Sequence, residues 1–251
     1  NCWPKVDIRA VAETADHRIL VATSDGLFEV RDERLHPLPG PSPALSLLPR
    51  PDGLWVGTRG GVERIQDGRG VRMPLPGANA AASVDHLVQA QDRVWIGTSA
   101  GLFARIGEAW EPIPADPAFD GSPIGAMLAD RDGNLWVGAN SGLARFRGGA
   151  LLEFIPDQGP QSFRQIVSML EDREGDLWLG SQLDGIARLW NGWTRRFSAA
   201  QGLNDPIVWS LAPGADGRTW VGSNDGLSVF DGRSGKPLEA VFVILNEKTR
   251  Q

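Results

Sequence analysis

One short phrase is written six times along this chain of 251 residues. In each copy an apolar run leads through a central residue, usually Trp, to a Gly, and a polar turn then leads to a second Gly and another alternating run. The copies are ILVATSDGLFEV from Ile19, LWVGTRGGVERI from Leu54, VWIGTSAGLFAR from Val94, LWVGANSGLARF from Leu135, LWLGSQLDGIARL from Leu177 and TWVGSNDGLSVF from Thr219. Successive central residues are 35 to 42 positions apart. A period near 40 residues indicates a repeat fold, in which each copy is one structural unit.

Each copy contains four short stretches of β type, separated by turn signals. In the fourth copy these stretches are IGAMLAD (124–130), NLWVGA (134–139), GLARF (142–146) and ALLEFI (150–155). Asp132-Gly133 precedes the second stretch, and the signal recurs at Asp52-Gly53 and Asp216-Gly217, with Glu174-Gly175 as a near match. Since Asp-Gly accepts positive φ at both central positions, these pairs predict two-residue type I′ hairpins.

Four antiparallel strands in every period cannot bury both faces of a sheet alone. Radial packing of successive sheets buries them and leaves few exposed edges, which is the arrangement of a β-propeller. We therefore expect an all-β fold, a β-propeller of four-stranded antiparallel blades with six repeats, forming either a six-bladed ring or part of a seven-bladed or larger array. A single propeller domain is expected over 1–251, with blades at approximately 6–40, 41–80, 81–121, 122–162, 163–204 and 205–245 and a polar tail at 246–251.

Two columns of the repeat have a structural interpretation. A large aromatic residue in the second strand fills the wedge between blades, and the Gly two positions later permits close approach by a neighbouring blade. The aromatic column is Trp55, Trp95, Trp136, Trp178 and Trp220, with Leu20 in the first copy, and the Gly column is Gly57, Gly97, Gly138, Gly180 and Gly222. A second Gly column (26, 61, 101, 142, 185 and 226) suits positive φ where the third strand begins.

Charge and composition exclude several classes of function. The net charge is −6 and the Lys and Arg residues are scattered, so neither nucleic acid nor an anionic membrane surface is an expected partner. No apolar run approaches the roughly 20 residues that a membrane span needs, so this segment is not expected to insert directly into a membrane. Because the chain starts with Asn rather than Met, we expect that a signal peptide or a larger parent sequence has been removed. Cys2 is the single cysteine and is expected to be a free thiol.

Motifs of catalysis and metal binding have simpler explanations here. The segment 97–101 matches G-x-S-x-G, but it joins two strands and no His follows it, so we interpret it as a hairpin. The segment 130–134 resembles the start of a calcium loop and lacks the remaining ligands of an EF-hand. His17, His36 and His86 belong to different columns of different copies, which argues against zinc. We expect no catalytic residues, no metal and no cofactor.

A binding surface is the remaining prediction. One face of a propeller is built from the second-to-third strand turns and the loops between blades, where sequence can vary while the framework stays constant. Trp209 lies on an inner strand, and its equivalent in copy five is taken to be Ser168. The Trp209 ring could stack on a ligand such as a sugar, plug the central channel or fill a gap between blades. Neutral drift on a solvated rim would produce the same variation between copies. The candidate ligand-binding residues are Arg59, Asn140, Arg164, Gln182, Asp184, Trp209, Asn224 and Asp225.

The paired halves LWVG and GL-x-R-F resemble the two-component regulator propeller repeat over about residues 6 to 235. Copies two, four and five fit the pattern best. Copy one departs from it at Leu20 and Ala22, and copy five carries one extra residue, Leu183. The resemblance implies rings of seven blades, often two in tandem, within longer proteins.

The same resemblance implies the periplasmic or extracellular part of a bacterial membrane-bound signalling protein. Such a parent would continue into a small β-sandwich, a membrane span and a cytoplasmic kinase or diguanylate cyclase. We expect a non-catalytic, ligand-sensing module that binds a small molecule or oligosaccharide and that contacts neighbouring domains of its parent or a second copy. The alternatives are a protein–protein interaction scaffold and a secreted propeller lyase or hydrolase.

Overall fold

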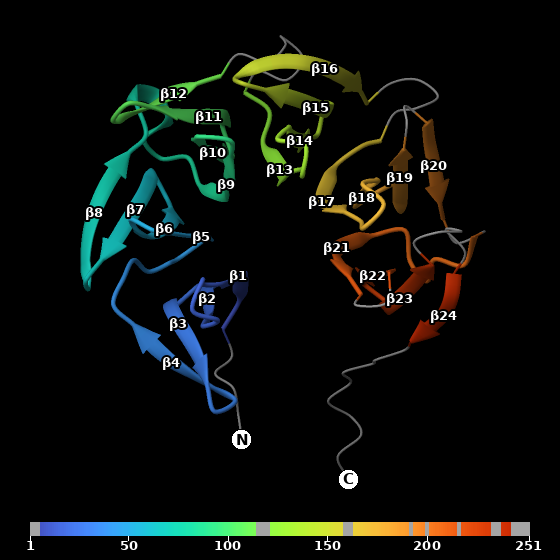
Figure 1. Ribbon diagram of the computed structural model, residues 1–251, viewed down its shortest axis with the longest axis horizontal. Coiled ribbons are helices and arrows are strands. Elements are labelled where there is room, and N and C mark those ends of the chain that lie inside the picture. The colour runs from blue at the N-terminus through green and yellow to red at the C-terminus, as the bar shows by residue number, and fades with distance from the viewer. Residues whose placement is uncertain are drawn as a thin grey trace. The chain divides into compact units, whose positions relative to one another are not determined.

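The computed structural model describes residues 6–113, 121–157, 163–190, 193–198, 201–214, 217–231 and 237–241. These residues form six four-stranded antiparallel sheets, and each sheet uses four strands in sequence order (Figure 1). Each sheet corresponds to one copy of the repeat, so the prediction of an all-β propeller with six four-stranded blades is confirmed. A short 3₁₀ turn lies at Gly77–Asn79, between blades 2 and 3.

The chain divides into two compact units, and the N-terminal unit (Asn1–Ile124) holds blades 1 to 3. Blade 1 comprises β1 (Ile8–Glu13), β2 (Ile19–Thr23), β3 (Gly26–Arg31) and β4 (Arg34–Leu38). Blade 2 comprises β5 (Ser46–Arg50), β6 (Gly53–Thr58), β7 (Gly61–Gln66) and β8 (Arg69–Pro74). Blade 3 comprises β9 (Val84–Ala90), β10 (Arg93–Thr98), β11 (Gly101–Ile106) and β12 (Ala109–Pro112). The first strands lie side by side within this unit, and the fourth strands fan outward (Figure 1).

The C-terminal unit (Gly125–Gln251) holds blades 4 to 6, apart from the first residue of β13. Blade 4 comprises β13 (Ile124–Ala129), β14 (Leu135–Ala139), β15 (Gly142–Arg147) and β16 (Ala150–Pro156). Blade 5 comprises β17 (Ile166–Glu171), β18 (Leu177–Ser181), β19 (Ile186–Trp190) and β20 (Trp193–Phe197). Blade 6 comprises β21 (Val208–Pro213), β22 (Arg218–Ser223), β23 (Gly226–Asp231) and β24 (Pro237–Val241). The single domain over 1–251 stays a prediction, and the expected tail 246–251 lies outside the described residues.

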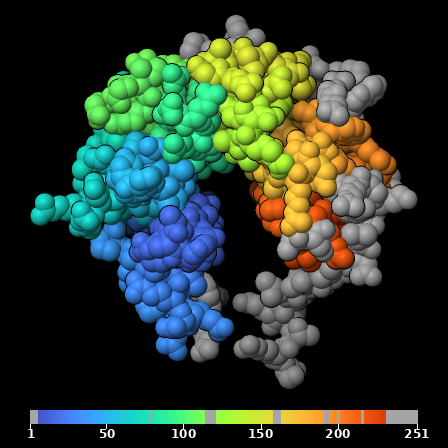
Figure 2. Space-filling view, in the orientation of Figure 1, coloured from blue at the N-terminus to red at the C-terminus, as the bar shows by residue number. Residues whose placement is uncertain are grey.

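The central tryptophans of blades 2, 4 and 5 pack against the blade that follows. Trp55 of blade 2 shares a hydrophobic core with Val84 and Phe103 of blade 3, and it is 3% exposed. Trp178 of blade 5 likewise shares a core with Val208 of blade 6. Trp95 and Trp136 are also buried, and Trp220 is partly exposed. Figure 2 shows blades 1 to 3, coloured blue to green, packed side by side in this way.

The glycines of the repeat meet two different demands. Gly57 lies against the backbone of the next blade, so a Cβ there would overlap the carbonyl oxygen of Val84. A Cβ on Gly180 would lie 2.7 Å from Cγ1 of Val208, again in the next blade. The six glycines that begin the third strands, by contrast, have φ between 75° and 153°, a conformation that few residues with a Cβ adopt.

In blades 2, 4 and 5 the turns before the central tryptophans are not the type I′ hairpins that the sequence predicted, and in blade 6 Asp216 of the predicted turn lies outside the described residues. In blade 4, Gly133 N–H donates to the Asp130 carbonyl (3.1 Å) and Asp130 N–H donates to the Asn134 carbonyl (3.0 Å), which closes a three-residue loop. Only Gly133 in this loop has positive φ, at 81°. The Asp130 carboxylate accepts the Asn134 N–H (2.7 Å) and so fixes the longer loop. In blade 2 the type I′ turn is excluded because Pro51 holds its own φ near −65°.

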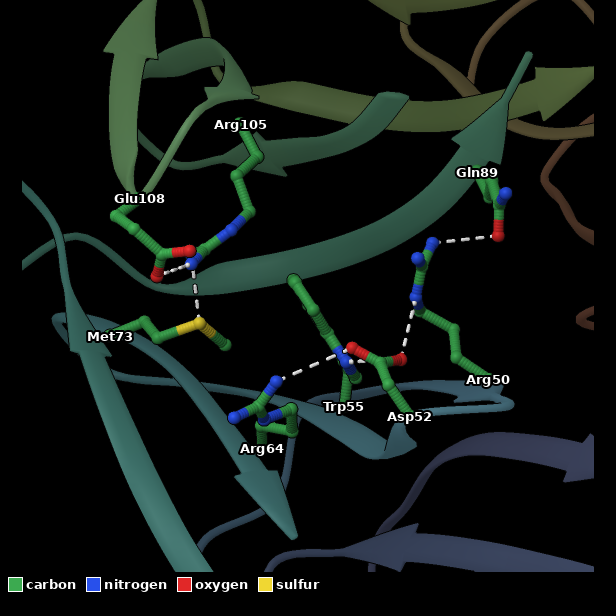
Figure 3. Close-up of polar contacts among 8 residues, drawn as sticks. All are labelled: Arg50, Asp52, Trp55, Arg64, Met73, Gln89, Arg105 and Glu108. Carbon is green, nitrogen blue, oxygen red and sulfur yellow. Dashed lines mark hydrogen bonds and ion pairs between the residues drawn. The ribbon is translucent and has the colours of Figure 1, made fainter. Parts of the chain in front are cut away.

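An Asp–Trp–Arg network stabilises the wedge in blades 2, 4 and 5. In blade 2 the Asp52 carboxylate accepts hydrogen bonds from Trp55 Nε1 (3.2 Å), Arg50 Nε (3.1 Å) and Arg64 Nη1 (3.5 Å) (Figure 3). Burial opposes ionisation of Asp52, yet the hydrogen bond and charge of Arg50 hold the pKa of that carboxyl below its ordinary value. The guanidinium of Arg50 also lies over the Trp55 ring, 5.1 Å from its centroid.

The same network explains two sequence features. In blade 4, Trp136 Nε1 donates to Asp130 Oδ2 (2.8 Å) and Arg145 lies 5.3 Å from the ring centroid. In blade 5, Trp178 Nε1 donates to Asp172 Oδ2 (2.8 Å) beneath Arg188. In blades 4 and 5 the Arg of GL-x-R-F therefore stacks on the central ring. The Asp that suggested a calcium loop binds an indole N–H, and among the described residues no cluster of three His, Cys, Asp or Glu could hold a metal.

Candidate functional site

The second-to-third strand turn and the start of the first strand lie at the same end of each blade, because adjacent strands are antiparallel. Of the eight ligand-binding residues predicted from the sequence, six lie at this end of blades 5 and 6, and Asn140 lies at the same end of blade 4. Arg59 lies in the N-terminal unit, where its backbone bridges to Ser83. The structure therefore allows a site to be built from blades 5 and 6 alone.

Arg164 and Asp184 form the charged part of this site. Arg164 donates to the Asp184 carboxylate from its backbone N–H (2.9 Å), from Nε (3.2 Å) and from Nη2 (2.8 Å). The Asp184 side chain is 15% exposed, whereas that of Arg164 is 52% exposed. Burial opposes ionisation of Asp184, yet the hydrogen bonds from Arg164 hold the pKa of Asp184 below its ordinary value. Asp184 is thus a fixed anion that orients a half-exposed guanidinium.

Backbone hydrogen bonds hold this pair in place. Ser181 Oγ donates to the Arg164 carbonyl (2.6 Å) and accepts the N–H groups of Leu183 and Asp184, both at 2.9 Å. The Gln182 N–H donates to the carbonyl of Gln165 (3.2 Å). Gln165 itself has φ of 47°, a left-handed conformation that is uncommon for a residue with a side chain. The loop before β17 and the β18–β19 turn therefore form one connected structure.

Trp209 forms the aromatic part of the site. It lies at an irregularity of strand pairing, because Val208 pairs with Ser223 while Ser210 pairs with Gly222. Such a bulge redirects a side chain. The Trp209 side chain is 51% exposed, and its Nε1 donates to Asn224 Oδ1 at 2.6 Å. The Asn224 amide thus fixes the indole while much of the ring stays open to solvent.

The sequence alignment of Trp209 with Ser168 is wrong by one residue. In blade 5, Ile166 pairs with Ser181 and Ser168 pairs with Gly180, so Val167 occupies the bulge that Trp209 occupies in blade 6. Ser168 instead corresponds to Ser210, and each lies ten positions before its central Trp. The error arose because a bulge adds a residue to one strand without leaving a sequence signal.

The charged and aromatic parts lie on neighbouring blades. The Gly185 N–H donates to the carbonyl of Pro206 (3.0 Å), which joins the β18–β19 turn of blade 5 to the loop entering β21. We define the blade 5–6 rim as Arg164, Gln182, Leu183, Asp184, Trp209 and Asn224. Leu183, which the sequence singled out only as an extra residue, is 48% exposed there. Asn140 and Asp225 are exposed in their own turns.

Comparison with known proteins identifies the repeats of the C-terminal unit. Residues 118–141 and 160–182 match the two component regulator propeller family. These two segments are regulator propeller repeats. The resemblance inferred from LWVG and GL-x-R-F is confirmed over these two segments, and it supports a propeller module of a signalling protein. No curated protein sequence matches the chain significantly.

Solved structures share the fold of these regulator propeller repeats. A catalytically inactive variant of virginiamycin B lyase from Staphylococcus aureus, solved with quinupristin, is 13% identical with a TM-score of 0.74, and the match covers 96% of this chain and 86% of that chain. PorZ, a surface component of the type-IX secretion system of Porphyromonas gingivalis, is 16% identical with a TM-score of 0.70, covering 96% of this chain and 42% of that chain. Identities this low show the fold alone.

The Arg164–Asp184 pair predicts a pH dependence of stability for this propeller. Since the pKa of Asp184 lies below the ordinary 3.8, the pair stabilises the fold above that pH and the contribution is lost as pH falls through the lower folded value. Arg164 is half-exposed, so we expect the contribution to be at most about 1 kcal/mol. Urea denaturation of the wild type and Asp184→Asn should show their difference shrinking as the pH falls from about 5 to about 2.

The matched control for this prediction is Asp225→Asn, in the exposed turn of the next blade. It is expected to change the free energy of unfolding by no more than about 0.5 kcal/mol at any pH. A constant difference between the wild type and Asp184→Asn over the whole pH range would contradict the assigned ion pair.

Proposed function

We propose that this chain is the non-catalytic, ligand-sensing propeller of a bacterial membrane-bound signalling protein of the sensor kinase or diguanylate cyclase type. The regulator propeller repeats support the signalling class. Among the described residues, no helix has the length and apolar character to cross a membrane. We place the module in the periplasm or outside the cell, with the output domain in the rest of the parent protein.

The observation that carries ligand binding is the half-exposed Trp209, fixed by Asn224 on the blade that follows the one with the Arg164–Asp184 pair. Binding sites combine apolar or aromatic surface with a few oriented polar groups. Here one indole face, two amide side chains and an oriented guanidinium lie at the same end of two neighbouring blades. This chemistry suits a polar ligand with a flat apolar face, such as a sugar ring of an oligosaccharide.

The electrostatics of the rim support binding rather than catalysis. A carboxyl that acts as a general acid near neutral pH needs a raised pKa. The pKa of Asp184 is lowered, and its carboxylate accepts three hydrogen bonds from Arg164. The likeness to virginiamycin B lyase extends to the fold and not to a catalytic role for this carboxylate.

Signalling through such a module requires that the ligand distinguish two states of the parent protein. A ligand can shift an equilibrium only by its difference in affinity for the two arrangements. The blade 5–6 rim includes loops from two successive blades, so a ligand that contacts both Arg164 and Trp209 would depend on how those blades are arranged. We propose that this dependence couples ligand binding to the neighbouring domains.

A thermal-shift screen tests the proposal. The purified chain would be screened with oligosaccharides, amino acids and divalent metals with and without chelator. A ligand at 100 times its Kd stabilises the native state by about 2.7 kcal/mol, which corresponds to roughly 5–10 °C for a chain of this size. Trp209→Ala is expected to lower affinity for the hit by about tenfold, equivalent to about 1.4 kcal/mol.

Two control variants make this test specific. Trp209→Phe keeps an aromatic face and loses the hydrogen bond to Asn224, so it should retain more affinity than Trp209→Ala. Arg59→Ala, in the N-terminal unit, should leave the shift unchanged if blades 5 and 6 bind the ligand. No shift with any compound would refute small-molecule sensing and would favour a protein-docking scaffold that uses Leu183 and Trp209, the exposed apolar residues of the rim.

A further inference from the structure

A cleft of about 730 Å³ lies between blades 1 and 2, within the N-terminal unit. Its apolar walls come from β2, β3, β4, β6 and β7 and consist chiefly of Leu20, Leu27, Leu38, Leu54 and Ile65. Small-molecule sites typically have volumes of about 300–1,000 Å³ and predominantly apolar walls. The cleft therefore has the size and lining of a ligand site, and it is separate from the blade 5–6 rim.

The cleft occurs where the Asp–Trp–Arg network is replaced. Leu20 stands in the column of the central tryptophans, and its cross-strand partner is Glu29. In blades 2, 4 and 5 the corresponding partner of the Trp is an Arg. Thr14 closes the three-residue loop of blade 1 as Asp130 does in blade 4, since its N–H donates to the Arg18 carbonyl (2.9 Å). All three members of the network have thus changed in blade 1, which forms one side of the cleft.

The wedge between blades 2 and 3 shows what the cleft lacks. There the Trp55 ring occupies the wedge, Trp110 meets it edge-on with centroids 6.2 Å apart, and Arg105 of blade 3 lies 5.3 Å from its centroid. At the position in blade 2 that corresponds to Arg105, the chain presents Ile65. Between blades 1 and 2, therefore, the indole is missing and the cation above it is replaced by an aliphatic side chain.

The mouth of the cleft is acidic. It carries Glu13, Asp16 and Asp67 against the guanidinium groups of Arg18 and Arg50. Arg18 is paired with Asp16 (2.8 Å), and Arg50 is bonded to Asp52 and Gln89. In the part of the chain that the structure describes, Asp67 forms no ion pair, whereas Glu13 faces His17. A cation entering the mouth would therefore meet an exposed carboxylate without displacing an existing partner.

We propose that this cleft binds a small aromatic amine, with the ring against the partly buried Leu38, Leu54 and Ile65 and the ammonium group at Asp67. Leu20 and Leu27, each 3% exposed, form the core beneath these side chains, so the ring would lie over the aliphatic residues that replace the indole of the neighbouring wedge. The ammonium group would be attracted by the net negative mouth. This site is independent of the function proposed for blades 5 and 6.

Titration calorimetry with a charge series of indoles tests the site. Tryptamine, neutral indole and indole-3-acetate share one ring and differ in charge. Tryptamine is expected to bind more tightly than indole by about two- to fivefold, the range of an exposed ion pair, and indole-3-acetate more weakly than indole. Asp67→Asn should remove the preference for tryptamine and leave the affinity for indole unchanged.

Filling the cleft provides the second test. Leu20→Trp restores the residue of the other copies, and it is expected to weaken tryptamine binding at least tenfold. Trp209→Ala, on the blade 5–6 rim, should leave tryptamine binding unchanged, so this proposal and the sensor proposal fail separately. Methyl NMR of the wild type avoids reliance on any variant, since tryptamine should shift the methyl signals of Leu38, Leu54 and Ile65.

Three outcomes would overturn the proposal. The first is the absence of binding of both tryptamine and indole to the folded wild type. The second is binding that shifts methyl signals elsewhere or that a folded Leu20→Trp variant retains in full. The third is equal affinity for tryptamine and indole-3-acetate, which would refute the cationic preference.

Discussion

Replacing Trp178 with alanine is expected to lower the free energy of unfolding by about 3–5 kcal/mol, the usual cost of truncating a fully buried aromatic side chain. Trp178 is 0% exposed and is among the largest fully buried side chains of the described residues. Its ring stacks on Phe197 with centroids 5.8 Å apart, and its Nε1 donates to Asp172. The variant would leave a cavity between blades 5 and 6 and a buried carboxylate without one of its donors.

Urea denaturation followed by circular dichroism measures this loss as a lower midpoint at an unchanged m value. Trp209→Ala is the matched control, since it removes the same side chain from a half-exposed position in the next blade, and it should cost about 1 kcal/mol or less. Trp178→Phe keeps part of the stack and should lie between the two. Equal losses for Trp178→Ala and Trp209→Ala would contradict the assignment of the central column to the wedge between blades.

The sequence predicted the framework of the fold because the framework obeys local rules. The period of the repeat predicted the blades, and the alternation of apolar and polar residues predicted the strands. The glycine at the start of each third strand predicted a positive φ, which most other residues disfavour. In blade 4 the strands begin and end within one residue of the predicted stretches. These features are repeated, so each copy supports the interpretation of the others.

The candidate sites depend on features that the repeat does not encode. The bulge at Trp209 shifts the register by one residue, and only the pairing of β21 with β22 reveals it. Arg164 and Asp184 are twenty positions apart, and they meet because a loop and a turn of one blade reach the same end. The loop before the tryptophan was misassigned because the side chain of Asp130, rather than the Asp-Gly pair, determines its length. The sequence showed that Leu20 departs from the repeat. It could not show the cleft, because the cleft is formed by the packing of two blades.

Gly57→Ala is expected to destabilise the N-terminal unit by about 1–3 kcal/mol, the usual cost of overpacking a well-packed core. The added Cβ would overlap the Ser46 hydroxyl and the backbone carbonyl of Val84 in the next blade. Those two groups are already hydrogen-bonded to each other at 2.8 Å. A backbone carbonyl cannot rotate away as a side chain can, so relief would require blades 2 and 3 to separate.

Gly70→Ala, on the outer strand of the same blade, is the control that distinguishes backbone overlap from a general effect of losing glycine. Its Cβ would meet only the side chain of Glu63, which is flexible and can move aside. We therefore expect Gly70→Ala to change the free energy of unfolding by about 0.5 kcal/mol or less. If both alanine variants denature at the urea midpoint of the wild type, the blades are not in the close contact assigned to them. A loss confined to Gly57→Ala would instead show that glycine in this column sets the distance at which one blade can pack against the next.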